Sequence, residues 1–137
     1  MIARQLCLVS ACLVGLCTRY DGCSKQNQAC LPLLLQFDWI PVCPEQLGGL
    51  PTPRLPAQIM GGDGHAVLAG HAMVIDPYGR DLTPFCVRGA NMVLTIAQMQ
   101  QINTAFLKAS SPSCGVTPQT GVTAALLLDH GLEVHTY

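Results

Sequence analysis

Short apolar runs alternate with segments of helical periodicity along most of this 137-residue chain, and this alternation constrains the fold more than any other feature. A short apolar run bounded by turn residues is typical of a buried strand, whereas apolar residues three and four positions apart indicate an amphipathic helix. The predicted strands cover residues 5–11, 39–43, 105–107 and 132–135, and the predicted helices cover about 24–37, 83–103 and 122–130. Such alternation favours a small Rossmann-like, three-layer α/β domain with a mainly parallel sheet, which we expect to span residues 1–137.

Local signals support these boundaries. Ser24 and Thr83 are residues that can cap the first and second helices at their N-termini, and Gly131 can end the last helix. Pro41 lies within a predicted strand and is tolerated there only near a strand end or in an edge strand, because it cannot donate a backbone hydrogen bond to the ladder.

Residues 44–64 form a long proline- and glycine-rich segment without periodicity. It contains four prolines and five glycines, and loops of this length in compact domains are usually functional or disordered. Residues 65–76 alternate weakly and are predicted to form a β-hairpin that turns at Gly70. We therefore expect an inserted loop plus a hairpin between the second and third strands of the sheet.

Composition excludes several classes of protein. Seven Lys and Arg residues oppose eight Asp and Glu residues, and the net charge of −1 offers no electrostatic footprint for a nucleic acid duplex or an anionic membrane. No uninterrupted apolar run reaches the length of a membrane-spanning helix. Eight cysteines could form four disulfides in a secreted chain. However, this chain is long and aliphatic enough to fold without them, so we expect mostly reduced thiols in a cytoplasm.

Three of the cysteines share a position relative to the predicted strands. Cys12 and Cys43 lie at the ends of the first two strands, and Cys114 lies in the loop after the third. Residues at the carboxyl ends of parallel strands converge on the ligand-binding edge of an α/β sheet. Three thiolates would repel one another unless a cation held them, and they suit zinc or an iron–sulfur cluster. No CxxC pair is present, so inert buried thiols remain the alternative.

Cys12 has a further possible explanation. Residues 9–12 read Val-Ser-Ala-Cys and resemble the cleavage box of a bacterial lipoprotein signal. The apolar region before this box is at the lower limit for a signal peptide, and the apolar stretch continues beyond it to Leu16. Cleavage would also remove a good buried strand, which argues against a lipid anchor.

Several motifs resemble one protein family in order along almost the entire chain. They are S-A-C-L-V-G at 10–15, R-Y-D-G at 19–22, P-V-C-P-E-Q-L-G-G-L-P-T-P-R at 41–54, D-L-T-P-F-C-V-R-G-A at 81–90, S-P-S-C-G at 111–115 and G-V-T-A-A-L-L at 121–127. On these motifs the chain is similar to the thiouracil desulfidases, a bacterial iron–sulfur family. It departs from the family's pattern at residues 116–120, where relatives commonly carry a longer glycine-rich segment.

The resemblance implies a [4Fe–4S] cluster bound by Cys12, Cys43 and Cys114, with one iron left without a protein ligand. An open iron is a Lewis acid that can accept the sulfur of a thiolated pyrimidine while water attacks the ring carbon. Thiouracil would give uracil and sulfide without electron transfer. The implied partners are a small thiopyrimidine substrate and the iron–sulfur assembly machinery.

The resemblance also suggests catalytic residues. Glu45, one of only two glutamates in the chain, is favoured as an acid/base group, and Ser111 as its partner. Their alternatives are a solvated loop carboxylate and a turn-forming serine. A non-enzymatic iron–sulfur sensor or sulfur carrier is the rival function, and it would need no such groups beside its cluster.

The remaining polar candidates are less specific. Ser113, Arg19, Tyr20 and Asp21 are predicted to bind substrate, although an Arg–Asp pair could equally tie down a loop. Arg54 could bind a phosphate or carboxylate, and His65 with His71 could bind zinc. The alternative for all three is that they are ordinary surface residues.

Overall fold

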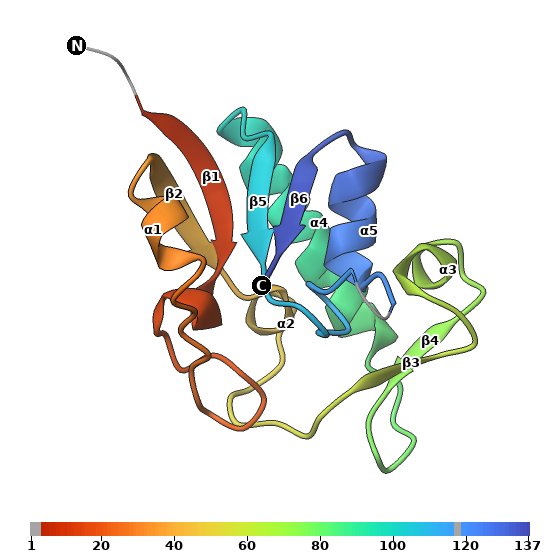
Figure 1. Ribbon diagram of the computed structural model, residues 1–137. Helices are drawn as coiled ribbons and strands as arrows, with labels where there is room; N and C mark the ends of the chain where they lie inside the picture. The colour runs from red at the N-terminus through yellow and green to blue at the C-terminus, as the bar shows by residue number, and fades with distance from the viewer. Residues whose placement is uncertain (1–3, 117–118) are drawn as a thin grey trace.

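A four-stranded parallel sheet forms the centre of the molecule (Figure 1). The computed structural model describes residues 4–116 and 119–137. The strands are β1 (Gln5–Ser10), β2 (Phe37–Val42), β5 (Thr104–Leu107) and β6 (Glu133–Thr136), in the order β2-β1-β5-β6, and each adjacent pair is parallel. The predicted parallel α/β architecture is confirmed. Pro41 lies in β2, which is an edge strand as its missing N–H requires.

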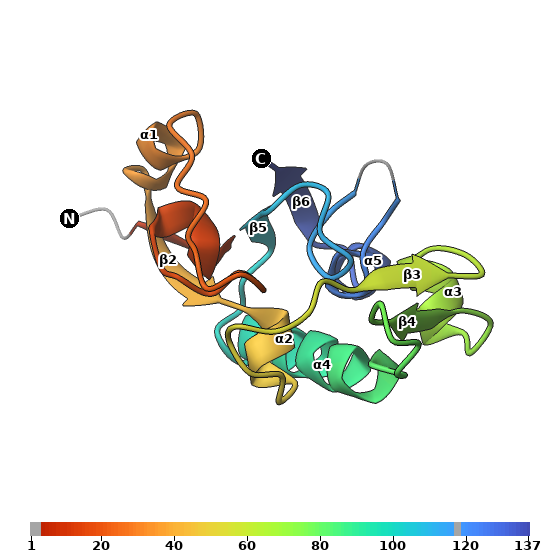
Figure 2. The ribbon, with the colours of Figure 1, turned by 90° about the horizontal axis from the view of Figure 1, so that it is seen from below.

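Helices cover the two faces of this sheet and create the three expected layers. In β1, Cys7 and Val9 pack with α1 (Leu31–Leu34), whereas Leu8 packs with α4 (Thr83–Met99) and α5 (Val122–Asp129) on the opposite face. In β5, Phe106 and Leu107 divide between the two faces in the same way. This alternation follows from the two-residue period of strand side chains. Figure 2 shows α1 on one side of the strands, with α4 and α5 on the other.

The remaining elements are short and lie between β1 and α4. They are η1 (Ala11–Val14), α2 (Pro44–Leu47), β3 (Gln58–Met60), α3 (Gly64–Leu68) and β4 (Met73–Ile75). Strands β3 and β4 form a separate antiparallel pair away from the main sheet. In the described part of the chain, no helix combines the length and the apolar character that crossing a membrane requires.

The predicted hairpin over residues 65–76 is wrong in its boundaries. A hairpin-like pair exists, but its strands β3 and β4 lie on either side of α3, which occupies residues predicted as strand. The Asp63 side chain caps α3 by accepting a hydrogen bond from the Ala66 N–H at 3.0 Å. Val67 is buried against the neighbouring core. The Asp63 cap and the packing of Val67 therefore favour a helical turn over the strand that the weak alternation predicted.

The first predicted helix, residues 24–37, is also mostly wrong, since only Leu31–Leu34 are helical. The Asn27 side chain accepts hydrogen bonds from the N–H groups of Ala29 and Cys30, which forms a local turn instead of a helix. The backbone of Lys25 is tied to the Cys12 carbonyl by a 2.9 Å hydrogen bond. Long-range tethering to η1 thus replaces the predicted cap at Ser24.

The other two helices match their predictions more closely. The helix predicted over 83–103 ends at Met99, and its N-cap position is Leu82 rather than Thr83. The Thr83 hydroxyl instead accepts a hydrogen bond from the Val74 N–H and joins α4 to β4. The last helix ends at Asp129, and Gly131 follows with a positive φ of 81°, as predicted for its stop.

Helices α2 and α4 touch through their backbones at two glycines. A Cβ atom on Gly48 would lie 1.9 Å from the Phe85 carbonyl oxygen, and one on Gly89 would lie 1.9 Å from the Pro44 carbonyl oxygen. Only glycine allows such an approach. The crossing fixes α2, and with it the residues at the end of β2, against the longest helix.

We expect Gly89→Ala to lower the free energy of unfolding by about 1–3 kcal/mol, because the added methyl forces the two backbones apart. The effect should appear although alanine is the better helix former. Urea unfolding followed by circular dichroism under reducing conditions measures it. Gln98→Ala, at an exposed position of the same helix, is the control. Equal stability of the two variants would contradict the close-contact explanation.

Candidate functional site

Three cysteines from distant parts of the sequence line one cavity at the carboxyl edge of the sheet. Cys12 lies in η1 directly after β1, Cys43 directly follows β2, and Cys114 lies in the loop after β5. The cavity has a volume of about 230 Å³. It lies where parallel strands end, as ligand sites in α/β sheets generally do. The predicted convergence of the three residues is therefore present.

The thiols of this site are held in a protein interior. Cys12 and Cys114 are only 7% and 5% exposed. Burial raises the pKa of Cys114 to about 12, and the neighbouring Cys43, Cys12 and Glu45 contribute to the increase. Burial also raises the pKa of Cys12, with a further contribution from Cys43. Such thiols are neutral by themselves, and a bound cation is required to hold them as thiolates.

The donor set fits a cluster better than a single metal ion. Within residues 4–116 and 119–137, no three His, Cys, Asp or Glu side chains are close enough to bind one ion. An iron–sulfur cluster is larger, so its cysteine ligands lie further apart, and thiolates are the donors it uses. His65 instead lies 3.3 Å from Asp129, and His71 is exposed. The zinc interpretation of these histidines gains no support.

The other five cysteines are absent from the described lining of the cavity. Cys7 and Cys30 are buried between β1 and α1, and Cys86 is buried in α4. Burial raises the pKa values of Cys7 and Cys86 to about 12, which is typical of inert core thiols. Cys17 and Cys23 are exposed. All eight cysteines are unpaired, so the structure contains no disulfide.

Glu45 lies in the first turn of α2, two residues after Cys43, and lines the same cavity. Its side chain is 13% exposed, and its Oε1 atom accepts a 3.2 Å hydrogen bond from Nε of Arg54. The pair is nearly removed from solvent, since the Arg54 side chain is 6% exposed. The structure thus excludes the solvated-loop alternative for Glu45.

Arg54, a candidate binder of phosphate or carboxylate in the sequence analysis, binds the carboxylate of Glu45 in the structure. The other nitrogens of its guanidinium donate to the Thr52 hydroxyl and to the carbonyls of Pro51 and Thr18. The backbone N–H of Arg54 also donates to the Tyr20 carbonyl. The sequence carried a signal for this pairing, since Arg54 is the single Lys or Arg within residues 44–64, the segment that also contains Glu45.

Ser111 lies in a tight loop beside Cys114. Its Oγ atom accepts hydrogen bonds from the backbone N–H groups of Ser113 and Cys114, both at 3.1 Å. These two bonds orient the hydroxyl and leave its proton to donate elsewhere. The adjacent Ser110 has a positive φ of 60°, which is strained for a residue with a side chain, and it also lines the cavity.

The structure divides the four predicted substrate-binding residues into two groups. Arg19 and Tyr20 line the cavity, whereas Asp21 and Ser113 do not belong to its described lining. Asp21 pairs with Arg19 at 3.7 Å and accepts a hydrogen bond from the Cys23 N–H, so it stabilises its own loop. Ser113 is 1% exposed, and its hydroxyl lies beside the buried Cys86 thiol.

Lys108 is a residue of the cavity wall that the sequence analysis did not identify. It directly follows β5, and its backbone N–H donates to the Ser10 hydroxyl at 2.9 Å. Burial lowers the pKa of Lys108, while the nearby Cys12 opposes that change. Together with Arg19, Lys108 brings positive charge to the Cys12 side of the cavity.

Residues 116–120 form the segment that we expect to be shorter than in relatives of the family. Residues 117–118 of this segment lie outside the described part of the chain.

Comparisons with known proteins show the family to which the chain belongs. The model of the 2-thiouracil desulfurase family matches residues 7–137. The protein YbbK of Bacillus subtilis (strain 168), named as uncharacterized, is 37% identical over 139 residues, covering 93% of this chain and 92% of that protein. The structure of the [4Fe-4S]-dependent thiouracil desulfidase TudS matches with a TM-score of 0.82 and 35% identity, covering 97% of this chain and 91% of that chain. This chain therefore belongs to the 2-thiouracil desulfurase family.

Proposed function

We propose that this chain, acting as one desulfidase-like domain over residues 1–137, removes sulfur from thiolated pyrimidines with the help of a [4Fe–4S] cluster. The observation that carries the proposal is the meeting of Cys12, Cys43 and Cys114 in one cavity with Glu45 and Ser111. The similarity to a solved [4Fe-4S]-dependent thiouracil desulfidase supports both the cofactor and the substrate class.

The three cysteines are the residues that would hold the cluster. A cluster with three cysteine ligands supplies one iron without a protein ligand, which is a Lewis acid with affinity for sulfur. Lys108 and Arg19 place positive charge beside Cys12 and favour its thiolate form. Both cations therefore favour binding of a negatively charged group at this end of the cavity.

Glu45 and Ser111 supply the proton transfers that replacement of sulfur by oxygen requires. The Glu45 carboxylate accepts a proton from the attacking water through Oε2, since Oε1 is bonded to Arg54. The Ser111 hydroxyl, oriented by the two backbone N–H groups, donates to the substrate as charge develops on it. A sensor or sulfur carrier would need neither group, which favours an enzyme.

The proposed reaction is hydrolytic and balances without electrons. Thiouracil and water give uracil and hydrogen sulfide: the carbon–sulfur bond breaks, a carbon–oxygen bond forms, and both protons of water leave with the sulfur. The substrate is a small thiopyrimidine. Eight unpaired thiols fit a reducing cytoplasm, where the iron–sulfur assembly machinery would load the cluster.

The first test of the proposal concerns the cluster ligands. We expect serine substitution of Cys12, Cys43 or Cys114 to abolish the brown colour and most of the bound iron after anaerobic reconstitution, because each removes one ligand. Iron and sulfide assays with an absorption spectrum measure this. Cys17→Ser and Cys86→Ser are the controls and should retain iron. Full iron content in any of the first three variants would overturn the ligand assignment.

The second test concerns Glu45. We expect Glu45→Gln to retain its iron and to lose about 10²–10⁴-fold in kcat on thiouracil, since glutamine preserves the size of the side chain but cannot accept the proton. Turnover is measured as uracil formation by chromatography, and iron content is assayed in the same samples. A cluster-loaded variant with near-normal turnover would leave Glu45 without a catalytic role.

The third test separates hydrolysis from redox chemistry. Reconstituted enzyme supplied anaerobically with thiouracil in ¹⁸O-labelled water, without a reductant, should complete many turnovers and place the label on the carbon that lost sulfur. Mass spectrometry of the uracil measures the incorporation. A requirement for an electron donor, or unlabelled product, would contradict the hydrolytic mechanism.

A further inference from the structure

The guanidinium of Arg54 is the most extensively bonded side chain in the site. Its Nε atom donates to Oε1 of Glu45 at 3.2 Å, its Nη1 atom to the Thr52 hydroxyl at 2.8 Å and the Pro51 carbonyl at 3.1 Å, and its Nη2 atom to the Thr18 carbonyl at 2.9 Å. All three nitrogens are therefore engaged. Since the group is planar and 6% exposed, these bonds fix its position in every direction.

This fixed guanidinium controls one oxygen of Glu45. Oε1 is occupied by Arg54, and no described residue hydrogen-bonds to Oε2. The carboxylate lines the cavity, so Oε2 is the oxygen through which it can reach water or substrate. When a planar guanidinium binds one oxygen of a carboxylate, it also determines the direction in which the other oxygen points.

The same guanidinium joins Glu45 to the loop after η1 that contains Thr18. The Thr18 carbonyl, which accepts from Nη2 of Arg54, also accepts from the Cys43 thiol at 3.7 Å. Nη2 itself lies 3.9 Å from the Cys43 sulfur. Arg54 thus connects the junction of β2 and α2, which contains Cys43 and Glu45, to the loop after η1.

We propose that Arg54 is a positioning residue, which aims the Glu45 carboxylate into the cavity through the buried Nε–Oε1 bond. This inference rests on the proposed function, because it assigns Arg54 a role through the acid/base group of that reaction. Lysine cannot replace it, since an ammonium group has no planar fork and cannot serve Glu45, Thr52 and Thr18 in one geometry.

Arg88 provides a matched control. Its Nη1 atom donates to the Gly48 carbonyl at 3.2 Å, beside α2, and its guanidinium lies over the Phe85 ring. Arg88 is therefore a second arginine that contacts the region around α2. Neither of these two contacts involves Glu45 or Cys43. Arg54→Lys and Arg88→Lys each replace a planar guanidinium by an ammonium group, at two places near α2.

The experiment compares the anaerobically reconstituted full chain in six forms: wild type, Arg54→Lys, Arg88→Lys, Thr52→Val, Glu45→Gln and the double variant Arg54→Lys/Glu45→Gln. Iron content, melting temperature, kcat and KM on thiouracil are measured for each. We expect Arg54→Lys to keep its iron and to lose about 10²-fold in kcat with little change in KM, as misplaced catalytic groups do. Arg88→Lys should remain within about twofold of wild type.

The double variant decides whether Arg54 acts through Glu45. If it does, the double variant is as slow as Glu45→Gln alone, because a lost carboxylate cannot be misplaced. Independent losses that multiply would overturn the proposal. So would loss of iron in a folded Arg54→Lys protein, because the role of Arg54 would then be to retain the cluster.

Thr52→Val keeps every charge and removes the hydroxyl that accepts hydrogen bonds from Nη1 of Arg54 and from the exposed Gln46 side chain. It should fold as wild type does and should lose kcat in the same direction but to a smaller extent, so it tests the proposal even if Arg54→Lys does not fold. Wild-type kcat in Thr52→Val or in Arg54→Lys overturns the positioning role alone. A cluster-loaded wild type that fails to desulfurate thiouracil would instead overturn the proposed function.

Discussion

The parallel pairing of β1 with β2 and with β5 determines what the site can contain. Since these strands run in the same direction, the residues that follow them meet at one edge of the sheet, however distant they are in the sequence. Cys12, Cys43 and Cys114 each come from a different crossover (Figure 1). No local motif joins them, and no CxxC pair is needed, because the sheet itself brings the three thiols together.

The second constraint is the rigid placement of α2. Gly48 and Gly89 bring the backbones of α2 and α4 into contact, and the Arg54–Glu45 ion pair holds the first turn of α2. Glu45 is thereby fixed by both packing and charge. The acid/base role that we propose for Glu45 requires such support, because small displacements of reacting groups are costly.

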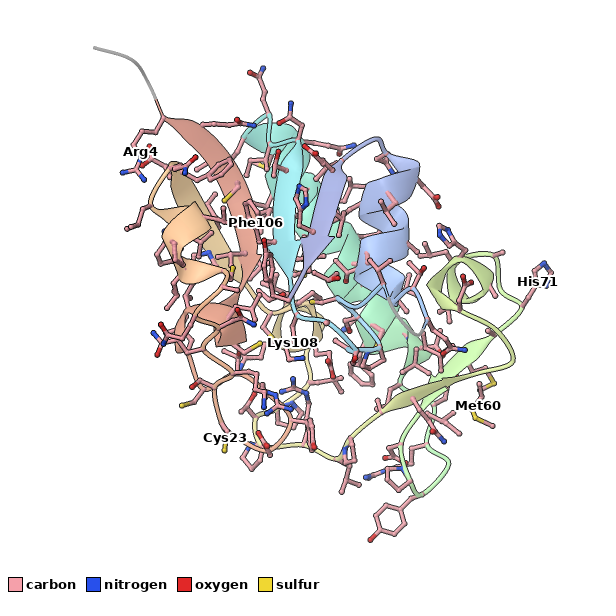
Figure 3. The ribbon with its side chains drawn as sticks, viewed as in Figure 1. Arg4, Cys23, Met60, His71, Phe106 and Lys108 are labelled. Carbon is pink, nitrogen blue, oxygen red and sulfur yellow. The ribbon has the colours of Figure 1, made fainter. Side chains whose placement is uncertain are left out.

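Burial and nearby charges have opposing effects on the protonation of the site cysteines. Burial favours neutral thiols at Cys12 and Cys114, whereas Lys108 and Arg19 favour the thiolate at Cys12. The sticks in Figure 3 place Lys108 at the carboxyl end of the sheet, and Cys23 in the loop that leads away from it. The two cations therefore offset part of the effect of burial at Cys12, while the net charge of the chain remains close to zero.

The sequence by itself determined the α/β class, the parallel sheet and the expected convergence of three cysteines, because hydrophobic periodicity and the alternation of strands with helices are local features of a sequence. It could not determine that residues 24–30 form a tethered loop or that α3 interrupts the hairpin, since both depend on contacts with distant residues. Only the tertiary structure showed that Arg54 pairs with Glu45 and that Ser113 lies away from the cavity. The physical reason is that burial and ion pairing are properties of neighbours in space, which a single sequence does not record.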